Sequence, residues 1–162
     1  GWYQGKAEFG PRALGNRSII VDPRWSKNKE LVNSKIKFRE SFRPFAPSIL
    51  QEHFNDYFEP ENNISPYMIL AFDVKKNKQK IIPAVTHIDG TARVQTVNKT
   101  DNQKYWNLIN EFYKITGIPV VLNTSFNRMG EPIVNTPTEA INCLLGSGLD
   151  AIAIGDYLIM KE

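Results

Sequence analysis

The sequence predicts a mixed α/β domain in which helices pack on a sheet in two or three layers. Short segments with strand patterns alternate along the chain with segments whose apolar residues recur at helical spacing. The length of 162 residues fits one domain and leaves little room for a second. Because 41% of the residues are hydrophobic and 23% are charged, the composition is that of a globular protein and not of a disordered one.

The first third of the chain is predicted to contain two strands, a helix and an extended segment. Residues 2–4 have the pattern of a strand end, and the β-branched run 18–21 predicts a strand that closes in an Asp-Pro turn. Apolar residues recur at helical spacing over 26–37, where Ser26 is the expected N-cap. Residues 43–47 contain two prolines, which exclude a helix interior and favour an extended backbone.

The middle of the chain is predicted to contain two more strands and a long helix. Residues 67–74 predict a mostly buried strand, and the four lysines within 74–80 predict a solvated hairpin tip after it. The alternation over 92–97 predicts the next strand. Residues 102–116 form the clearest helical pattern, with aromatic and aliphatic residues on one face, and Gly117 is placed to end that helix.

The last third is predicted to complete the sheet. A buried strand is expected at 118–122, followed by a helix at 137–145. Thr136 is the expected N-cap of this helix, because a proline follows it at the first helical position. Residues 151–154 and 158–160 predict two closing strands.

Charge favours one kind of ligand and argues against another. Twenty lysines and arginines against 17 acidic residues give a net charge of +3, which is too low for a general nucleic-acid coat. Five of the seven arginines lie between Arg12 and Arg43. Because guanidinium groups stay protonated, this local concentration of charge predicts an anionic ligand.

Other features of the sequence favour a cytoplasmic protein with no membrane segment. Cys143 is the single cysteine, so no internal disulfide forms, and it is expected to be a small buried hydrophobe. No run approaches the roughly 18 apolar residues of a membrane span, and no secretory signal opens the chain. Because the chain opens at Gly1 inside a strand pattern, we expect it to be part of a larger protein.

The first candidate motif is the loop 8–18, which contains two glycines, a proline, and Arg12 and Arg17 five positions apart. Such a loop would expose backbone N–H groups to an anion, and either arginine would grip a phosphate or carboxylate with two hydrogen bonds. The alternative is an ordinary Gly/Pro turn with solvated arginines.

The second motif is the segment 37–44, where cations are interleaved with aromatic residues. In an extended strand, Phe38 and Phe42 would form a hydrophobic anchor on one face, opposite a polar row. That row would consist of Lys37, Arg39, Ser41 and Arg43. In a helix, two of these arginines would still align four positions apart. The alternative is an exposed charged face with an ion pair to Glu40.

The third motif is the turn 86–91 and the strand that follows it. His87 and Asp89 would be an acid/base pair or metal ligands, or they would only hydrogen-bond within the loop. Arg93, flanked by small or apolar residues, is a candidate phosphate clamp.

The fourth motif follows the buried strand 118–122 and contains Asn123 and Ser125. Amide and hydroxyl groups at the carboxyl end of a strand are well placed to hold a ligand in an open α/β sheet. The same residues would also suit a capped turn.

The strings 8–19, 37–47, 83–97 and 119–134 resemble, in the same order, the carboxyl-terminal region of O-carbamoyltransferases that act in nodulation-factor and antibiotic biosynthesis. The resemblance covers nearly the whole chain. It implies a YrdC-like fold, similar to that of threonylcarbamoyl-adenylate synthases, with a twisted mixed open sheet and flanking helices around a basic cavity.

The resemblance also implies an activity. A domain of this family would convert carbamoyl phosphate and ATP, with magnesium, to carbamoyl adenylate. A separate amino-terminal actin-like domain, which residues 1–162 do not contain, would pass the carbamoyl group to an acceptor hydroxyl. The resemblance further implies that the family's domain begins with a helix and a strand before Gly1.

The resemblance assigns roles by matching position, and these roles agree with the need of phosphoryl chemistry for charge stabilisation. No protein metal ligand is expected in this domain. The expected catalytic residues are Lys37, Arg43 and Arg93. The expected substrate-binding or nucleotide-binding residues are Arg12, Arg17, Arg39, Asn123 and Ser125.

Two other functions remain open at this point. A non-catalytic anion or nucleotide sensor would bind the same ligands without turnover. An RNA-binding module would use the basic cavity, but the low net charge and the lack of an aromatic stacking signature argue against it.

Overall fold

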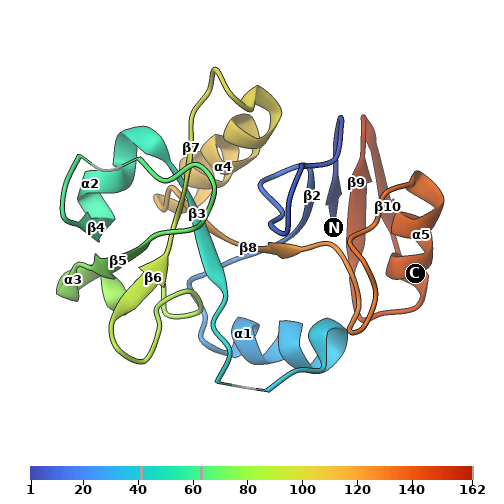
Figure 1. The fold of residues 1–162 in the computed structure, drawn as a ribbon, viewed down its shortest axis with the longest axis horizontal. Helices are drawn as coiled ribbons and strands as arrows, with labels where there is room; N and C mark the ends of the chain where they lie inside the picture. The colour runs from blue at the N-terminus through green and yellow to red at the C-terminus, as the bar shows by residue number, and fades with distance from the viewer. Residues whose placement is uncertain (41, 63, 162) are drawn as a thin grey trace.

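The structure is a computed structural model that describes residues 1–40, 42–62 and 64–161. Its centre is a seven-stranded mixed sheet in the order β10-β9-β1-β2-β8-β3-β7, next to a three-stranded antiparallel sheet in the order β4-β5-β6 (Figure 1). Helices flank the sheets, so the predicted mixed α/β class is confirmed.

The elements have the following bounds. The strands of the large sheet are β1 (Trp2–Tyr3), β2 (Arg17–Val21), β3 (Ala46–Leu50), β7 (Gln95–Val97), β8 (Val120–Ser125), β9 (Ala151–Ile154) and β10 (Tyr157–Met160). The small sheet consists of β4 (Phe58–Glu59), β5 (Ala71–Val74) and β6 (Thr91–Arg93). The helices are α1 (Lys27–Val32), its π-helical continuation η1 (Asn33–Lys37), the 3₁₀ turn η2 (Gln51–His53), α2 (Phe54–Tyr57), α3 (Lys76–Gln79), α4 (Gln103–Thr116) and α5 (Pro137–Leu145).

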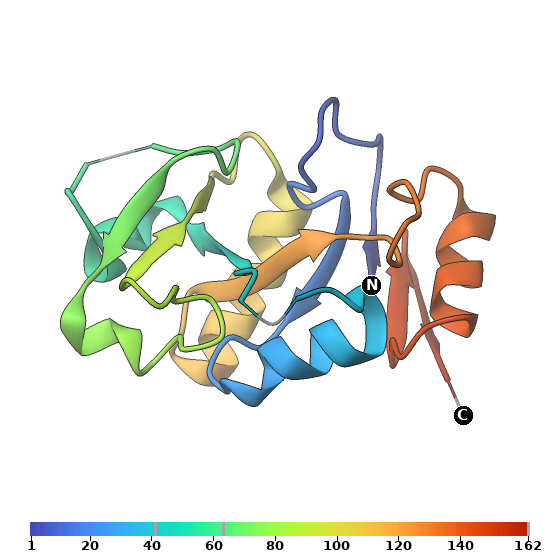
Figure 2. The ribbon, with the colours of Figure 1, turned by 60° about the horizontal axis from the view of Figure 1, so that its bottom comes forward.

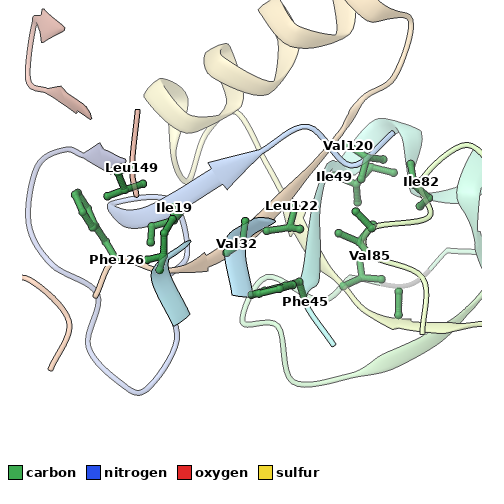
Figure 3. Close-up of a cluster of buried hydrophobic side chains, with 14 of the residues drawn as sticks. Ile19, Val32, Phe45, Ile49, Ile82, Val85, Val120, Leu122, Phe126 and Leu149 are labelled. Atoms are coloured by element: carbon green, nitrogen blue, oxygen red, sulfur yellow. The ribbon is translucent and has the colours of Figure 1, made fainter. Parts of the chain in front are cut away.

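Strand β8 lies between two layers of the core, because successive side chains of a strand point to opposite faces. Val120 and Leu122 belong to the larger buried cluster, which includes residues of α1 and η1 (Figure 3). Val121 packs with Tyr105 and Ile109 of α4 in a second buried cluster. Figure 2 shows α1 in front of β8 and α4 behind it, so the two helices cover opposite faces of the sheet.

The two longest helices, α4 and α5, form where the sequence predicts them. Asn102 accepts a hydrogen bond from the backbone N–H of Tyr105, and Gly117 ends α4 in the left-handed conformation. Thr136 caps α5 as predicted and forms a capping box with Glu139. Cys143, predicted to be buried, is 2% exposed.

The predicted helix over 26–37 is present, but two of its features differ. The side chain of Ser26, the expected N-cap, makes no capping hydrogen bond because Ser26 itself has helical dihedral angles. The last turn is π-helical, and it ends at Phe38, whose φ of 43° is left-handed. A non-glycine residue in this conformation is uncommon, and it turns the chain sharply.

Between residues 67 and 97 the structure differs from the sequence-based prediction in three places. The strand predicted at 67–74 is regular only in β5, because Met68 has a positive φ of 55° and the preceding residues form a turn. The lysine-rich 74–80 forms the short helix α3 and not a hairpin tip, since the partner strand β6 begins only at Thr91. The single strand predicted at 92–97 is two strands, because β6 pairs with β5 while β7 pairs with β3.

None of the helices in the part of the chain that the structure describes has the length and hydrophobicity that a bilayer crossing requires.

Gly10 and Gly15 give a matched test of the packing in the loop between β1 and β2. Both have positive φ, 127° and 106°, but a Cβ on Gly15 would lie 2.1 Å from the Tyr105 ring, whereas a Cβ on Gly10 would meet nothing within 4 Å. We expect Gly10→Ala to lower the free energy of unfolding by about 1 kcal/mol through backbone strain. Gly15→Ala should cost about 1–3 kcal/mol more, because it also overpacks α4. Equal urea midpoints for the two variants would contradict this packing.

Candidate anion-binding site

Four arginines from three parts of the chain line one cavity of about 180 Å³. Arg12 comes from the β1–β2 loop, Arg39 and Arg43 from the segment between η1 and β3, and Arg93 from the end of β6. The remaining lining residues are Pro11, Ala13, Pro44, Phe45, Ala46, Met68, Asn123, Thr124 and Ser125. Six of the eight predicted site residues therefore meet here, namely Arg12, Arg39, Arg43, Arg93, Asn123 and Ser125.

The cavity is strongly positive. Among the described residues that line it, none is acidic. Burial, together with the charges of Arg43 and Arg93, lowers the pKa of Arg39, and burial together with Arg12 lowers the pKa of Arg93. Guanidinium groups remain protonated even so. The guanidinium groups of the lining therefore repel one another, and together they are complementary to a multiply charged anion.

Arg39 is fixed by contacts on three sides. Its Nε donates to Asn33 Oδ1 at 3.2 Å, one Nη donates to the Pro44 carbonyl at 3.2 Å, and its guanidinium lies 4.3 Å from the centre of the Phe45 ring. A planar guanidinium both stacks and donates in its plane, which a lysine would not do. Arg39 is thereby held at the cavity wall against the repulsion of its neighbours.

The segment 37–44 follows neither of its two predicted paths. Residues 38–40 and 42–44 form neither a strand nor a helix, because η1 ends at Lys37 and the chain turns at Phe38. The predicted hydrophobic anchor is wrong, since Phe38 and Phe42 are 58% and 70% exposed. The predicted ion pair with Glu40 is present, at 3.8 Å from Arg43. Ser41, predicted to share the cationic face, lies outside the described residues.

Lys37 lies behind the cavity and does not line it. Its amine donates toward four oxygens at the end of β8: the carbonyl and hydroxyl of Ser125 at 2.6 and 3.1 Å, and the carbonyl and Oδ1 of Asn127 at 3.0 and 2.6 Å. The residue is only 7% exposed. Burial, and to a smaller extent Arg39, lowers the pKa of Lys37 to about 7. Lys37 therefore fixes Ser125, which does line the cavity.

Arg17 also lies apart from the cavity lining. Its guanidinium donates to the carbonyls of Gln4, Asn16 and Gly5 at 2.8 to 3.0 Å, and it stacks on Tyr3 at 3.6 Å. At 3% exposed, it ties β2 to the residues after β1. Its predicted contact with substrate stays a prediction.

Four consecutive N–H groups where the β1–β2 loop enters β2 are satisfied within the chain, so these four do not serve as the ligand donors that the sequence analysis expects of the loop. Oε1 of Glu8 accepts hydrogen bonds from the backbone N–H groups of Leu14, Asn16 and Arg17, at 2.6, 2.7 and 3.3 Å. The N–H of Gly15 donates to Ser18 Oγ at 3.0 Å. Three earlier residues of the same loop, Pro11, Arg12 and Ala13, line the cavity.

A buried amide network lies beside the same loop. Asn123 Nδ2 lies within 3.1 Å of three acceptors: the Ala13 carbonyl, Ser48 Oγ and Gln95 Oε1. Ser48 donates to Gln95 Oε1 at 2.6 Å, and Gln95 Nε2 donates to the Leu14 carbonyl at 2.8 Å. Sequence reasoning missed Glu8, Ser48, Gln95 and Asn127. The available signal was a buried amide at an inward strand position, such as Gln95, which needs a partner.

His87 and Asp89 hydrogen-bond within their turn. His87 Nδ1 lies 3.1 Å from Thr91 Oγ1, and Asp89 Oδ1 accepts from the backbone N–H and the hydroxyl of Thr91 at 2.9 and 2.7 Å. Of the two interpretations left open, the geometry favours loop residues. Within the described ranges, no group of three or more His, Cys, Asp or Glu side chains is arranged to hold a metal ion.

Comparisons with known proteins match the chain over its full length. The family described as "Carbamoyltransferase C-terminus" matches residues 1–161. Nodulation protein NolNO of Sinorhizobium fredii is 51% identical over 164 residues, which cover 100% of this chain and 24% of that protein. Nodulation protein NolO of Bradyrhizobium diazoefficiens is 48% identical, with 100% and 30% covered, and nodulation protein U of Rhizobium tropici is 39% identical, with 98% and 27% covered.

The chain thus spans between about a quarter and a third of the length of these curated relatives. The family match nevertheless runs from the first residue to the last but one, through every segment that lines the arginine cavity. The chain belongs to the carbamoyltransferase C-terminus family.

Proposed function

We propose that this chain is the carbamoyl-activating domain of an O-carbamoyltransferase. It would bind carbamoyl phosphate in the arginine cavity and, with ATP and magnesium, form carbamoyl adenylate for transfer to an acceptor hydroxyl. The observation that carries the proposal is that four arginines line one cavity, which no carboxylate from the described part of the chain lines. Membership of a carbamoyltransferase family supports the carbamoyl part of the proposal.

The cavity suits the smaller of the two substrates. Its volume of about 180 Å³ is below the roughly 300 Å³ at which pockets for drug-sized ligands begin. A phosphoryl group would meet bidentate guanidinium donors there, while a whole nucleotide would extend beyond the mouth. The side chain of Arg43 is 55% exposed, so we assign it to the rim where the two substrates meet.

The reaction balances only with water. Carbamoyl phosphate, ATP and water give carbamoyl adenylate, inorganic phosphate and pyrophosphate. Water breaks the bond between the carbamoyl and phosphate groups, an oxygen of the carbamate then attacks the α-phosphorus of ATP, and pyrophosphate leaves. The arginines would stabilise the negative charge on the phosphoryl oxygens, which is the main contribution a protein makes to such steps.

Magnesium would arrive with the nucleotide. The described residues contain no cluster of three metal-ligating side chains, whereas Mg²⁺ in phosphoryl-transfer sites is held largely by substrate phosphates and water. When bound, the ion would neutralise charge on the leaving pyrophosphate.

The relatives are three to four times longer than this chain, so we infer that it works within a longer polypeptide. The missing part would include the amino-terminal actin-like domain with the acceptor site. We place the protein in the cytoplasm, where ATP and carbamoyl phosphate are available.

The test is isotope exchange between pyrophosphate and ATP in the full polypeptide, with and without carbamoyl phosphate. We expect exchange that depends on carbamoyl phosphate. Binding of both ligands without exchange would replace the proposal with a non-catalytic anion or nucleotide sensor. No binding of either ligand would remove the cavity from the function altogether.

Arg43→Ala tests the rim of the cavity. We expect it to reduce carbamoyl-dependent exchange by about 10²–10³, as loss of one oxyanion donor does in other enzymes. The melting temperature should hardly change, because the side chain is half-exposed and surface substitutions cost little. Arg128→Ala is the matched control, since Arg128 also pairs with a Glu three positions away but lies outside the cavity. Equal exchange rates in the two variants would exclude a role for Arg43.

Lys37→Met tests the buried amine. The pKa of Lys37 is about 7 in the folded chain against 10.5 ordinarily, so between these values the unfolded chain holds a proton that the folded chain has released. The free energy of unfolding therefore rises with pH in this window. From about pH 7 to pH 9 we expect the unmodified protein to gain on the order of 2 kcal/mol relative to Lys37→Met. Parallel pH profiles in urea denaturation would show that Lys37 keeps its ordinary pKa.

A further inference from the structure

The loop between β1 and β2 must hold Arg12 over the cavity without regular secondary structure. All three of its glycines, Gly5, Gly10 and Gly15, have positive φ, and Phe9 near its tip is fully exposed. Figure 2 shows this dark-blue loop projecting beyond the ends of strands β1 and β2. An arginine on such a segment is useful for binding only if the backbone around it is fixed, because positioning supplies much of the effect of a binding group.

The carboxylate of Glu8 fixes the N–H side of this loop. One oxygen, Oε1, accepts from the N–H groups of Leu14, Asn16 and Arg17 at 2.6, 2.7 and 3.3 Å. Nearby backbone N–H groups that converge in this way resemble the concave arrangement of N–H groups that binds anions in other proteins. Here the protein's own carboxylate occupies it.

The side-chain amides of Gln95 and Asn123 fix the C=O side. Gln95 Nε2 donates to the Leu14 carbonyl at 2.8 Å, and Asn123 Nδ2 donates to the Ala13 carbonyl at 3.0 Å. A carbonyl oxygen only accepts, so the nitrogen of each amide must face the loop. Oε1 of Gln95 then accepts a hydrogen bond from Ser48 Oγ, which fixes the orientation of the Gln95 amide. The two residues that follow Arg12 are thus held by side chains from β7 and β8.

We propose that Glu8 is a positioning residue for Arg12, with Gln95 completing the hold from the opposite side. The inference rests on the proposed function, since it assigns Arg12 to carbamoyl phosphate. Among the described residues, Glu8 makes no ion pair within 4 Å, so its hydrogen bonds act on the backbone and not on a guanidinium. Glu8 also places a negative charge in the loop of an anion site. The direction in which its removal changes anion affinity therefore distinguishes positioning from simple electrostatics.

Because a carboxylate repels an anion, Coulomb interactions alone predict that removing the Glu8 carboxylate strengthens anion binding. Positioning predicts the opposite. We expect Glu8→Ala to weaken binding of carbamoyl phosphate by at least about tenfold, the cost of lost hydrogen bonds that order a binding group. Glu8→Gln keeps an acceptor oxygen for the loop, so it should remain within about threefold of the unmodified protein.

The experiment is calorimetric titration of the full polypeptide with carbamoyl phosphate, in single variants and in an Arg12→Ala background. If Glu8 acts through Arg12, Glu8→Ala should weaken binding of carbamoyl phosphate by less than about a further twofold in the Arg12→Ala background, since the effects of coupled residues are not additive. Glu40→Ala is the control, because it removes an acidic residue beside the cavity that holds no part of the β1–β2 loop. It should bind carbamoyl phosphate as tightly as the unmodified protein or more tightly.

Gln95→Met provides a second route if Glu8→Ala does not fold, because it removes the donor to Leu14 from the other side of the loop. It too should weaken binding, and less so in the Arg12→Ala background. Tighter or unchanged binding in Glu8→Ala, or full additivity with Arg12→Ala, overturns the positioning role while the proposed function stands. If the unmodified protein binds no carbamoyl phosphate, the proposed function falls first and takes the inference with it.

Discussion

Repulsion among four guanidinium groups is the constraint on which the rest of the site depends. Arg12, Arg39, Arg43 and Arg93 line one small cavity, and none of them can relieve the repulsion by losing a proton. The fold must therefore counter this repulsion with contacts that hold the arginines in place. Arg39 is held by stacking on Phe45 and by two hydrogen bonds, and the loop of Arg12 by a carboxylate and two amides. In the proposed function, a bound anion would complete the charge balance.

The break between β6 and β7 makes this convergence possible. Because β6 pairs with β5 and β7 pairs with β3, residues two positions apart serve different sheets. Arg93 on β6 reaches the cavity, while Gln95 on β7 reaches the Leu14 carbonyl. One short segment thereby supplies both a guanidinium of the cavity and a support for the opposite wall. Lys37 likewise supports the cavity, because its amine donates hydrogen bonds to Ser125 and Asn127 at the end of β8.

Local signals in the sequence predicted some features and missed others, for physical reasons. The caps at Asn102, Gly117 and Thr136 place α4 and α5, because capping depends on residues within one turn. The path of 37–44 was not predictable in this way, since a left-handed Phe38 depends on surrounding packing that overrides local preference. Arginines were found by residue type and by family resemblance. Glu8 and Gln95 were missed, because their partners lie far along the chain or on loop backbone, where no periodicity reveals them.

A crystal structure of the protein with carbamoyl phosphate bound tests the central claim most directly. The account predicts the phosphoryl group in the cavity, with guanidinium nitrogens of Arg12, Arg39, Arg43 and Arg93 within hydrogen-bond distance of its oxygens. A phosphoryl group bound at another place, with these four arginines free of it, would contradict the account.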